Sequence, residues 1–543
     1  RWSVGSRRGN RGTHLKLARL IGEIGISRVN GRRARRQSDV VRFLKPDPDI
    51  ASLHSRAQNV KPGGLFVAIQ GFAADGHDYI DQALENGTVA VVAQKPVRLS
   101  SGVALIEVQD TRKALAALAA RFYGHPSEKL VVVGITGTNG KTTTSYLIER
   151  ILLQAGYAPG VIGTVNYRYA GETYDNPVTT PESLDLQRIL NRMLAAGVTH
   201  VILEVSSHAL DLHRVDGCWV DVGVFTNLSQ DHLDYHKDME TYWRCKKSLF
   251  TDILRSGPKQ KRAAAVINCN DPKGEELVRI DGLKKITVGD AQENTVRSDI
   301  SKQDLSGIAG RIDTPAGSFD FRSSLVGRFN CDNILCAAGV AVALDISPAA
   351  IKAGIENAAV IPGRLEPIPN QGQRFVYVDY AHTPDALRNV LAALTTMAGR
   401  RVLCVFGCGG DRDRSKRPQM GKIAAQMCDL AVVTSDNPRS EPPLAIIDQI
   451  LVGTRQVCRK EYSAAELRNG TPEKGYTVEP DRRQAIRLAI AASRPGDTVL
   501  IAGKGHETYQ ILGGGTIAFD DRTVAAQALA DVMCDASKEG NPQ

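Results

Sequence analysis

The chain alternates short apolar runs with stretches in which apolar residues recur at every third or fourth position. Short continuous apolar runs are typical of strands buried on both faces, and the wider spacing predicts amphipathic helices. Alternation of strands and helices requires right-handed crossovers between parallel strands, so the pattern predicts α/β domains with mainly parallel sheets. In such sheets, ligands bind beyond the carboxyl ends of the strands. The expected strands include "LFVAIQ", "KLVVV", "HVILE", "DVGVF", "AAAVIN", "FVYVD", "RVLCVF", "LAVV" and "TVLIAG".

Breaks in this alternation divide the chain into units. Residues 65–94 follow the order strand, glycine-rich turn, helix and strand, and 110–127 has helical spacing. Residues 358–368 contain Pro362 and Gly363, which interrupt regular structure, so this segment is typical of a linker. A chain of 543 residues is long enough for three α/β domains. We expect an extension at 1–12, a first helix at 14–25, and domains at 13–127, 128–361 and 362–543.

Composition is ordinary for a globular protein, with 42% apolar and 23% charged residues. No apolar run is long enough to cross a membrane. Ten cysteines are scattered without a Cys-x-x-Cys pair, and several lie in apolar runs. This use of cysteine favours reduced, buried thiols and a cytoplasmic location.

The net charge of +9 comes from one end of the chain. Residues 1–36 carry eleven Lys or Arg and one acid, Glu23, whereas the rest of the chain carries 57 basic and 58 acidic residues. We expect this basic arm to have no role in the chemistry. A transit peptide and a nucleic-acid contact are the alternatives.

A glycine-rich loop at 134–142, "GITGTNGKT", fits the pattern G-x-x-x-x-G-K-[ST]. An expected strand precedes it and an expected helix follows, which is the context that a phosphate-binding loop requires. Its backbone N–H groups can surround phosphates, Lys141 can reach the β- and γ-phosphates, and Thr142 can bind Mg²⁺. The loop predicts binding of ATP or GTP but does not reveal the reaction.

Several polar side chains follow the next expected strands. Glu204 ends "HVILE" and could be a second Mg²⁺ ligand, and a histidine near it could hold another metal ion. Taken alone, His232 and His236 are better explained as structural residues. Lys246 and Lys247, taken alone, are better explained as solvated surface lysines.

A series of segments, spread in order over roughly residues 50–525, resembles the Mur ligases. The segments are "GTNGKTT", "EVSSHALDLHRV", "TNLSQDHLDYH", "YWRCKKSLF", "GRFNCDN", "PGRLE", "DYAHTPDAL", "GCGGDRDRSKRP", "SDNPRSE" and "GKGHE". The resemblance is closest to members that add the third peptide residue of the peptidoglycan precursor. It implies an N-terminal UDP-sugar-binding α/β domain, a central P-loop ATPase domain with a mainly parallel sheet, and a Rossmann-like C-terminal domain that binds the amino acid.

The resemblance also implies the reaction. An ATP-dependent ligase would add meso-diaminopimelate to the D-Glu γ-carboxylate of UDP-MurNAc-L-Ala-D-Glu. The carboxylate would attack the ATP γ-phosphate, and the amine would then displace phosphate from the acyl phosphate. Two Mg²⁺ ions and cationic side chains would neutralise the anions that must meet. We expect a cytoplasmic monomer that acts on these three substrates, binds no nucleic acid and has no membrane span.

Residues at matching positions are expected to serve the nucleotide and the metal ions. Lys141, Glu204, His232 and Lys246 would be catalytic, and Thr142 would join the last three as metal ligands. Lys246 matches a lysine that family members carry as a carbamate, an anion able to support the second Mg²⁺. Cys245 is a departure, because the family often has alanine there. The expected ATP-binding residues are Gly137, Thr138, Asn139, Gly140, Lys141, Thr142, Thr143, Asn333, Arg364 and Asp379, with Asn330 and His382 beside them.

The UDP-sugar site is expected at Ser55, Thr179, Thr180, Ser206 and Arg214. His54 stands where the family usually has Asp. Val178 and Leu212 stand where some members have Asn and Gln, so those two contacts are not expected here.

The segment "TSDNPRSEPP", at 434–443, joins a strand to a helix and by itself is typical of a turn. In the family, "DNPR" is associated with diaminopimelate, which has one carboxylate more than L-lysine. An arginine fork suits a carboxylate better than a lysine ammonium does. We expect Arg439 to bind this carboxylate and Glu507 to accept hydrogen bonds from the distal ammonium. The full expected set is Arg412, Asp436, Asn437, Pro438, Arg439, Gly503 and Glu507.

Two other interpretations stay open. One is a ligase of the same family that adds L-lysine or, with less support, D-Ala-D-Ala, and the intact "DNPR" argues against both. The other is a plastid relative that serves as a non-catalytic scaffold, for which the basic arm is the only support. A scaffold predicts loss of Lys141, Glu204, Lys246 or Arg439, and all four are present.

Overall fold

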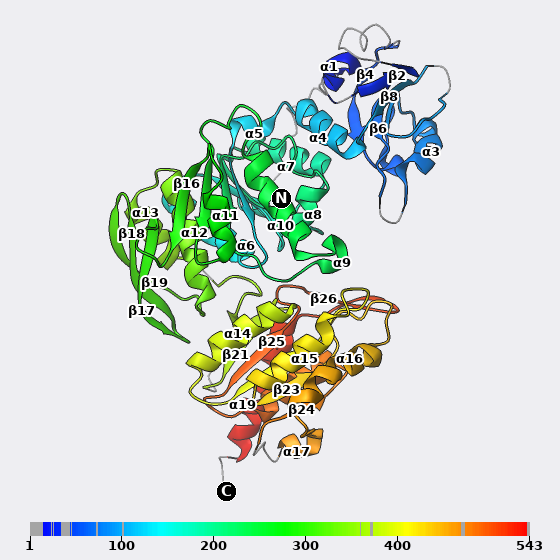
Figure 1. Cartoon of the computed structure of the whole chain (residues 1–543). Coiled ribbons are helices and arrows are strands. Elements are labelled where there is room, and N and C mark those ends of the chain that lie inside the picture. Colours follow the sequence, from blue (N-terminus) through cyan, green and yellow to red (C-terminus); the bar gives the residue numbers. More distant parts are fainter. Residues whose placement is uncertain are drawn as a thin grey trace, which may run out of the picture.

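The computed structural model of the chain describes residues 15–22, 24, 26–33, 44, 46–71, 74–99, 102–358, 360–369, 373–468 and 473–539. The predicted extension at 1–12 lies outside these residues. Three α/β bodies follow one another along the chain, and each is built on its own sheet (Figure 1). The predicted three-domain α/β class is confirmed, whereas the boundaries at 13–127, 128–361 and 362–543 stay predictions.

The N-terminal sheet has six strands in the order β3-β2-β8-β7-β6-β5. Strands β5 to β8 run parallel, and β2 lies antiparallel to β8. Every residue of β6, β7 and β8 is buried, as the continuous apolar runs predict. The elements are β1 Leu15–Lys16, α1 Leu17–Ile21, β2 Ile26–Val29, β3 Arg32–Arg33, β4 Asp49–Ile50, β5 Ser52–His54, η1 Ala57–Asn59, β6 Gly64–Val67, η2 Gly76–Tyr79, α3 Ile80–Glu85, β7 Ala90–Ala93, β8 Ala104–Val108, α4 Thr111–Phe122 and α5 Pro126–Lys129.

The first helix, α1, is shorter than the predicted helix at 14–25, because the chain enters it from a strand and leaves it at a glycine. Strand β1 pairs with β4 directly before the helix. Gly22 follows the helix at φ 36°, a left-handed conformation that ends helices and favours glycine. The guanidinium of Arg121 donates to the carbonyl of Ile21 (2.8 Å), so α4 satisfies the helix end.

The central sheet has eleven strands in the order β12-β11-β10-β13-β9-β14-β15-β16-β17-β18-β19. The strands from β10 to β17 are parallel, as predicted. Helices α6, α12 and α13 pack on one face, and α7 and α10 pack on the other. The elements of this core are β9 Val131–Thr136, α6 Lys141–Gln154, β10 Pro159–Ile162, α7 Ser183–Ala195, β13 His200–Glu204, α8 Ser207–Asp211, β14 Val222–Phe225, α9 Leu233–His236, α10 Met239–Ser248, the π-helical turn η3 Leu249–Ile253, β15 Ala264–Asn268, α11 Pro272–Val278, β16 Lys284–Gly289, α12 Phe329–Ala343 and α13 Pro348–Glu356.

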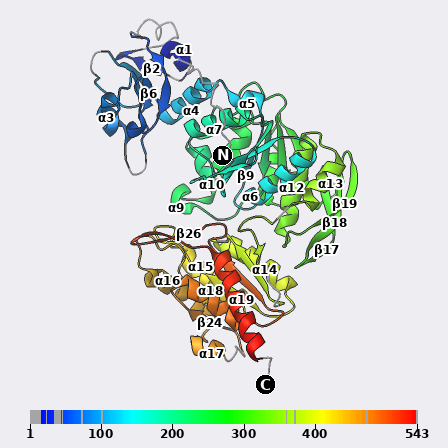
Figure 2. The same ribbon diagram turned by 180° about the vertical axis from the view of Figure 1, so that it is seen from behind.

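Antiparallel strands extend the central sheet at both ends, and the sequence pattern did not predict them. A hairpin of β11, Tyr167–Tyr169, and β12, Glu172–Tyr174, pairs with β10. At the other end β17, Val296–Asp304, β18, Gly307–Thr314, and β19, Gly317–Ser323, form a meander. Figure 2 shows this meander at the outer edge of the molecule.

The C-terminal sheet has six strands in the order β20-β21-β25-β22-β23-β24, parallel except for β20. The loops after β22, β23 and β25 leave the same edge of this sheet and carry the three predicted amino-acid-binding segments. The elements are β20 Glu366–Pro367, β21 Phe375–Asp379, α14 Pro384–Met397, β22 Val402–Phe406, α15 Lys416–Met427, β23 Leu430–Val433, α16 Pro443–Val457, α17 Ala464–Arg468, β24 Gly475–Val478, α18 Arg482–Ala492, β25 Thr498–Ala502, β26 Tyr509–Leu512, β27 Gly515–Ala518 and α19 Asp521–Glu539.

The C-terminal domain faces the phosphate loop of the central domain (Figure 1). Arg364 Nη2 donates to Thr142 Oγ1 (3.2 Å), and the backbone N–H of Gln230 donates to Asp385 Oδ2 (3.2 Å). The carboxyl ends of two parallel sheets therefore meet across one interface, which is where ligands bind in such folds. No helix among the described residues is long and apolar enough to cross a membrane.

Candidate active site

The phosphate loop joins β9 to α6 and depends on glycine at two positions. Gly140 has φ 85°, and a Cβ there would lie 2.1 Å from Asn333 Oδ1. A Cβ on Gly137 would lie 1.9 Å from Thr226 Oγ1. Helix α6 begins directly after Gly140, so its free N–H groups and the positive end of its dipole face the loop.

Lys141 folds back over this loop. Its Nζ donates to the carbonyls of Gly137 and Thr138, both at 2.8 Å. Burial lowers the pKa of Lys141, although Glu204 and Asp231 favour its charged form. These carbonyls are neutral acceptors. A phosphate bound within the loop would give the Lys141 ammonium an anionic partner and therefore a stronger interaction.

The other predicted loop residues form the wall of the nucleotide site. The hydroxyl of Thr138 lies 3.1 Å from Tyr242 Oη, and the N–H of Asn139 donates to Asn227 Oδ1 (2.9 Å). Asn333 on α12 bonds Asn330 Oδ1 through Nδ2 (2.9 Å) and accepts from Thr144 Oγ1 (3.4 Å). The predicted residues that are buried here are Gly137, Thr138, Thr142, Thr143, Asn330 and Asn333.

Glu204 ends β13 beside Thr142, as the sequence predicted. Its Oε2 accepts from Thr142 Oγ1 (3.1 Å) and from Thr164 Oγ1 (2.7 Å). Carboxylate and hydroxyl oxygens are donors that Mg²⁺ prefers. The described residues hold no cluster of three His, Cys, Asp or Glu side chains fit to bind a metal alone. Mg²⁺ would therefore need ATP or water oxygens as well, as is usual at nucleotide sites.

Lys246, on α10, lies at the floor of the same site. It is 1% exposed, its Nζ donates to Gly137 O (2.8 Å), and it lies over the Tyr242 ring at 4.3 Å. Burial, with Lys141 close by, holds the pKa of Lys246 well below its usual value. Lys247, its neighbour, keeps 35% of its side chain exposed and lies 3.9 Å from Glu276. The interpretation of Lys246, taken alone, as a solvated surface lysine is therefore wrong, whereas Lys247 is partly exposed to solvent.

His232 precedes α9 in a left-handed conformation, φ 55°, which is uncommon for a residue other than glycine. Desolvation lowers the pKa of the His232 imidazole below its usual value. Its Nε2 lies 3.3 Å from Asp231 Oδ2. Burial would raise the pKa of Asp231, but His232, His382 and Lys416 outweigh burial and hold it below its usual value. Asp231 was missed from the sequence, although it lies in the segment "TNLSQDHLDYH".

Asp379 and His382 approach from the C-terminal domain, but the structure gives Asp379 a backbone role. Its two carboxylate oxygens accept from the N–H groups of Leu365 and Ala381, both at 2.7 Å. This bonding holds the turn that carries Arg364. His382 Nδ1 lies 2.7 Å from Tyr380 O, and burial lowers its pKa.

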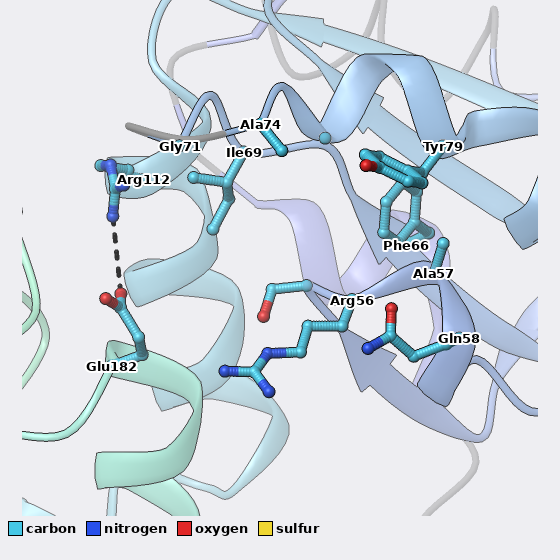
Figure 3. A pocket seen from close by; sticks show the side chains of 12 residues that line it. Arg56, Ala57, Gln58, Phe66, Ile69, Gly71, Ala74, Tyr79, Arg112 and Glu182 are labelled. Carbon is cyan, nitrogen blue, oxygen red and sulfur yellow. Dashed lines mark ion pairs between the residues drawn. The ribbon is translucent and has the colours of Figure 1, made fainter. Parts of the chain in front are cut away.

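A cavity of about 410 Å³ lies between the N-terminal sheet and the central domain, and Ser55, one of the residues predicted to bind the UDP-sugar, lines it. Figure 3 shows Arg56 projecting into this space, to one side of the ion pair between Arg112 and Glu182 (3.5 Å). Arg56, Arg112 and Glu182 were missed, because their approach depends on the packing of two domains. A larger hollow of about 1480 Å³ adjoins it and shares Ser55 and Arg56. His54 lies 2.7 Å from Ser52 Oγ.

The other predicted UDP-sugar residues lie between this cavity and Glu204. Thr180 Oγ1 donates to the backbone carbonyl of Glu204 (2.8 Å) and lies 3.3 Å from Ser206 Oγ. Arg214 donates to Thr180 O (3.1 Å) and forms an ion pair with Glu182 (2.8 Å). Thr179 Oγ1 lies 3.1 Å from Thr164 Oγ1. A substrate that enters at Ser55 can therefore extend along these residues to Glu204.

Replacing Arg56 by alanine is expected to raise the KM for the predicted substrate, UDP-MurNAc-L-Ala-D-Glu, by about tenfold, because a planar guanidinium is suited to a diphosphate. The KM for ATP should stay within about twofold. Steady-state phosphate release checks both values. Arg279→Ala, which removes only an exposed pair with Glu275, is the control and should change neither. An unchanged sugar KM in Arg56→Ala would exclude a contact of this side chain with the substrate.

The predicted amino-acid site is formed by loops after β22, β23 and β25. Arg439 has φ 54° and donates from Nη1 to Gly410 O (2.8 Å) and Asn437 O (3.4 Å). A Cβ on Gly409 would lie 2.9 Å from Arg439 Nη1 and 3.8 Å from Arg412 Cγ, so the two arginines flank Gly409. Asn437 Nδ2 donates to Glu507 Oε2 (2.9 Å). The predicted residues Arg412, Asp436, Asn437, Pro438, Arg439, Gly503 and Glu507 thus lie on three adjacent loops.

Reciprocal carboxylate contacts join the first two of these loops. Asp411 accepts from Ser440 Oγ (2.7 Å), and Glu441 accepts from the N–H of Asp411 (2.7 Å). The fully buried Arg417 donates to both oxygens of Glu441 at 3.0 and 2.8 Å. The segment "TSDNPRSEPP" does contain a turn, with Glu441 N bonded to Pro438 O (3.1 Å). The turn and the binding role are therefore compatible.

Comparison with known families covers most of the chain. Residues 49–123 match the Mur ligase family catalytic domain, 135–341 the Mur ligase middle domain, and 363–505 the Mur ligase glutamate ligase domain. The chain belongs to the Mur ligase family, as the sequence predicted.

Individual relatives show which ligases of this family the chain is similar to. The chain is 48% identical over 504 residues to the UDP-N-acetylmuramoyl-L-alanyl-D-glutamate--2,6-diaminopimelate ligase of Geobacter metallireducens, covering 92% of this chain and 99% of the relative. It is 44% identical to the ligase of the same name in Geobacillus thermodenitrificans, covering 89% and 96%. A solved structure with this ligase name aligns at 30% identity and a TM-score of 0.63, covering 89% of this chain and 95% of that one. A D-alanyl-D-alanyl ligase from Acinetobacter baumannii shares the fold, with 19% identity, a TM-score of 0.58 and coverage of 91% and 95%.

Proposed function

We propose that the chain is the ATP-dependent ligase that adds meso-diaminopimelate to the D-Glu γ-carboxylate of UDP-MurNAc-L-Ala-D-Glu in peptidoglycan synthesis. The observation that carries this function is the convergence of three sets of residues on one interface. Lys141 and Glu204 come from the phosphate loop and β13, Thr180 leads from the sugar cavity, and Arg439 comes from the amino-acid loops. The ligase names of relatives that match nearly the whole chain support the same function.

Each set has a part in the chemistry. A carboxylate is a poor acyl donor, because oxide is a poor leaving group, and transfer of the γ-phosphoryl group supplies a better one. Lys141, on the phosphate loop, offsets charge where the phosphate and the carboxylate meet. Arg439 and Glu507 orient the amino acid so that its unprotonated amine attacks the acyl carbon and phosphate departs. The C-terminal domain lies over the loop and limits access of water, which would otherwise hydrolyse the acyl phosphate.

Two Mg²⁺ ions and a carbamate on Lys246 belong to the same proposal. Thr142 and Glu204 offer the oxygen donors for one ion, and His232 lies near Lys246 for the second. Bound Mg²⁺ supplies positive charge to the phosphate oxygens. The buried, weakly basic amine of Lys246 is suited to carbamylation, because the unprotonated amine is the form that reacts with CO₂.

We further propose that domains 13–127, 128–361 and 362–543 bind the UDP-sugar, ATP and the amino acid, in that order. The positions of the Ser55 cavity, the phosphate loop and the Arg439 loops support this division. A cytoplasmic location fits the ATP and nucleotide-sugar substrates, and a monomeric state is part of the same proposal.

Phosphate release from ATP in the presence of UDP-MurNAc-L-Ala-D-Glu tests the function. With meso-diaminopimelate, we expect kcat/KM at least about a hundredfold above that with L-lysine. L-Lysine lacks the second carboxylate, so its binding would leave the charged group that pairs with this carboxylate buried without a partner. Equal rates, or a preference for L-lysine, would refute the proposed specificity. Failure to release phosphate with any amino acid would favour the non-catalytic scaffold.

A further inference from the structure

Lys504 lies beneath the predicted amino-acid site, although it is not among the residues expected to bind there. It belongs to the segment "GKGHE" after β25, and its side chain is 0% exposed. Its Nζ donates to Asn437 Oδ1 (2.9 Å) and Glu507 Oε2 (3.2 Å), and it lies 3.7 Å from Asp436 Oδ1. Lysine is almost never fully buried unless it is paired, so these contacts account for its position.

Lys504 helps to fix the orientation of the Asn437 amide. Oδ1 of Asn437 accepts from Lys504 and from the N–H of Ile511 (3.0 Å). An amide has one acceptor end and one donor end, so Nδ2 must point toward Glu507, to which it donates at 2.9 Å. The three residues Asp436, Asn437 and Glu507 are therefore arranged around one buried ammonium.

Asp436 keeps an unused acceptor in this arrangement. Its Oδ1 is buried and accepts no hydrogen bond from the part of the chain that the structure describes. A buried carboxylate oxygen without a donor is costly, so a donor from a ligand would be favoured there. An ammonium group of the incoming amino acid is such a donor.

Lys504 places one positive charge beside the two carboxylates Asp436 and Glu507. On the neighbouring loops, Arg412 and Arg439 add positive charge, and Asp411 adds a further carboxylate near Arg439. The amine that attacks must be unprotonated, so the reacting meso-diaminopimelate has two carboxylates and one ammonium and carries one net negative charge. L-Lysine in the same state is neutral. Without Lys504 the site would be more negative by one unit, which disfavours the dicarboxylic substrate relative to L-lysine.

We propose that Lys504 is a positioning and specificity-determining residue, which sets the charge and geometry of Asp436, Asn437 and Glu507 so that the site selects the dicarboxylic substrate. This inference rests on the proposed function. Lys504 acts through its neighbours and has no contact with the reacting atoms.

The test compares kcat/KM for meso-diaminopimelate with kcat/KM for L-lysine in wild type and in two neutral variants. Lys504→Met removes both the charge and the hydrogen bonds, and Lys504→Gln keeps a donor without the charge. In both variants the ratio should fall at least about tenfold, while the KM for ATP stays within about twofold. Lys504→Arg keeps the charge and should retain more of the ratio than either neutral variant.

Lys259→Met is the matched control for the loss of a buried lysine. Lys259 is 2% exposed and bonds Asp221 Oδ2 and Leu130 O, both at 2.5 Å, within the central domain. This variant should lose thermal stability without a change in the substrate ratio. A folded Lys504 variant that keeps the wild-type ratio, while the wild type is active, would overturn this inference alone. If the wild type releases no phosphate with meso-diaminopimelate, the proposed function fails and this inference fails with it.

Discussion

Replacing Lys246 by alanine is expected to lower kcat by at least about a thousandfold, with the overall fold retained. The side chain is buried against Gly137 and Tyr242 beside Lys141, so its loss removes the amine that would carry the proposed carbamate, an anion at the point where phosphate and carboxylate must meet. Losses of this size are typical when a preorganised electrostatic group is removed from an active site. Phosphate release at saturating substrates measures the change, and circular dichroism checks the fold.

Lys247→Ala is the control for this prediction, because Lys247 is adjacent in sequence but largely outside the site. It should retain kcat within about twofold, as expected for a weak surface ion pair. A second comparison addresses the carbamate itself. Depletion of bicarbonate should reduce wild-type activity and its return should restore it, and a ¹³C-carbamate signal should be present in wild type and absent from Lys246→Ala. Equal losses in Lys246→Ala and Lys247→Ala would contradict the role given to Lys246.

Replacing Arg439 by lysine is expected to raise the KM for meso-diaminopimelate at least about thirtyfold and to change the KM for ATP by less than about threefold. Nη1 of Arg439 is bonded to the carbonyls of Gly410 and Asn437, which leaves Nε and Nη2 for a carboxylate. A lysine ammonium cannot hold both the loop and a carboxylate in this planar arrangement. Loss of a partner from a desolvated charge pair has effects of this size.

Arg414→Lys is the matched control for Arg439→Lys. Arg414 lies near the same loops, but 67% of its side chain is exposed and its partner Glu441 is already held by Arg417. Its substitution should leave both KM values nearly unchanged. If Arg439→Lys also leaves the KM for meso-diaminopimelate unchanged, Arg439 is a turn residue and the preference for this substrate has another origin.

The parallel cores of the three sheets could be predicted from sequence, because strands buried on both faces leave continuous apolar runs such as "HVILE" and "TVLIAG". The meander β17–β19 could not. Strand β17 has only one buried residue, Val296, and its polar sequence "VRSDISKQD" lacks the apolar run that identifies a strand. Pairing with β18, rather than local pattern, determines that it is a strand. The predicted helix at 14–25 was too long, since Gly22 ends α1.

The candidate site likewise contains residues that could be predicted from sequence and contacts that could not. Residues within recognisable segments, such as Lys141, Glu204 and Arg439, could be predicted individually. The groups that hold them could not, because their partners are distant in sequence. Lys504 meets Asn437 across 67 residues. Neither residue carries a local signal of this contact, which exists only after β23 and β25 are placed in one sheet.

Glu204 forms hydrogen bonds with residues that serve two different substrates. Its carboxylate accepts from Thr142 of the phosphate loop, and its backbone carbonyl accepts from Thr180, one of the predicted UDP-sugar residues. One residue therefore sets the spacing between the two substrates that react first. Both contacts are made within the central sheet and its loops, so this spacing does not depend on the position of the outer domains. A change in the length of β13, even by one residue, would instead misalign the γ-phosphate and the D-Glu carboxylate while both substrates could still bind.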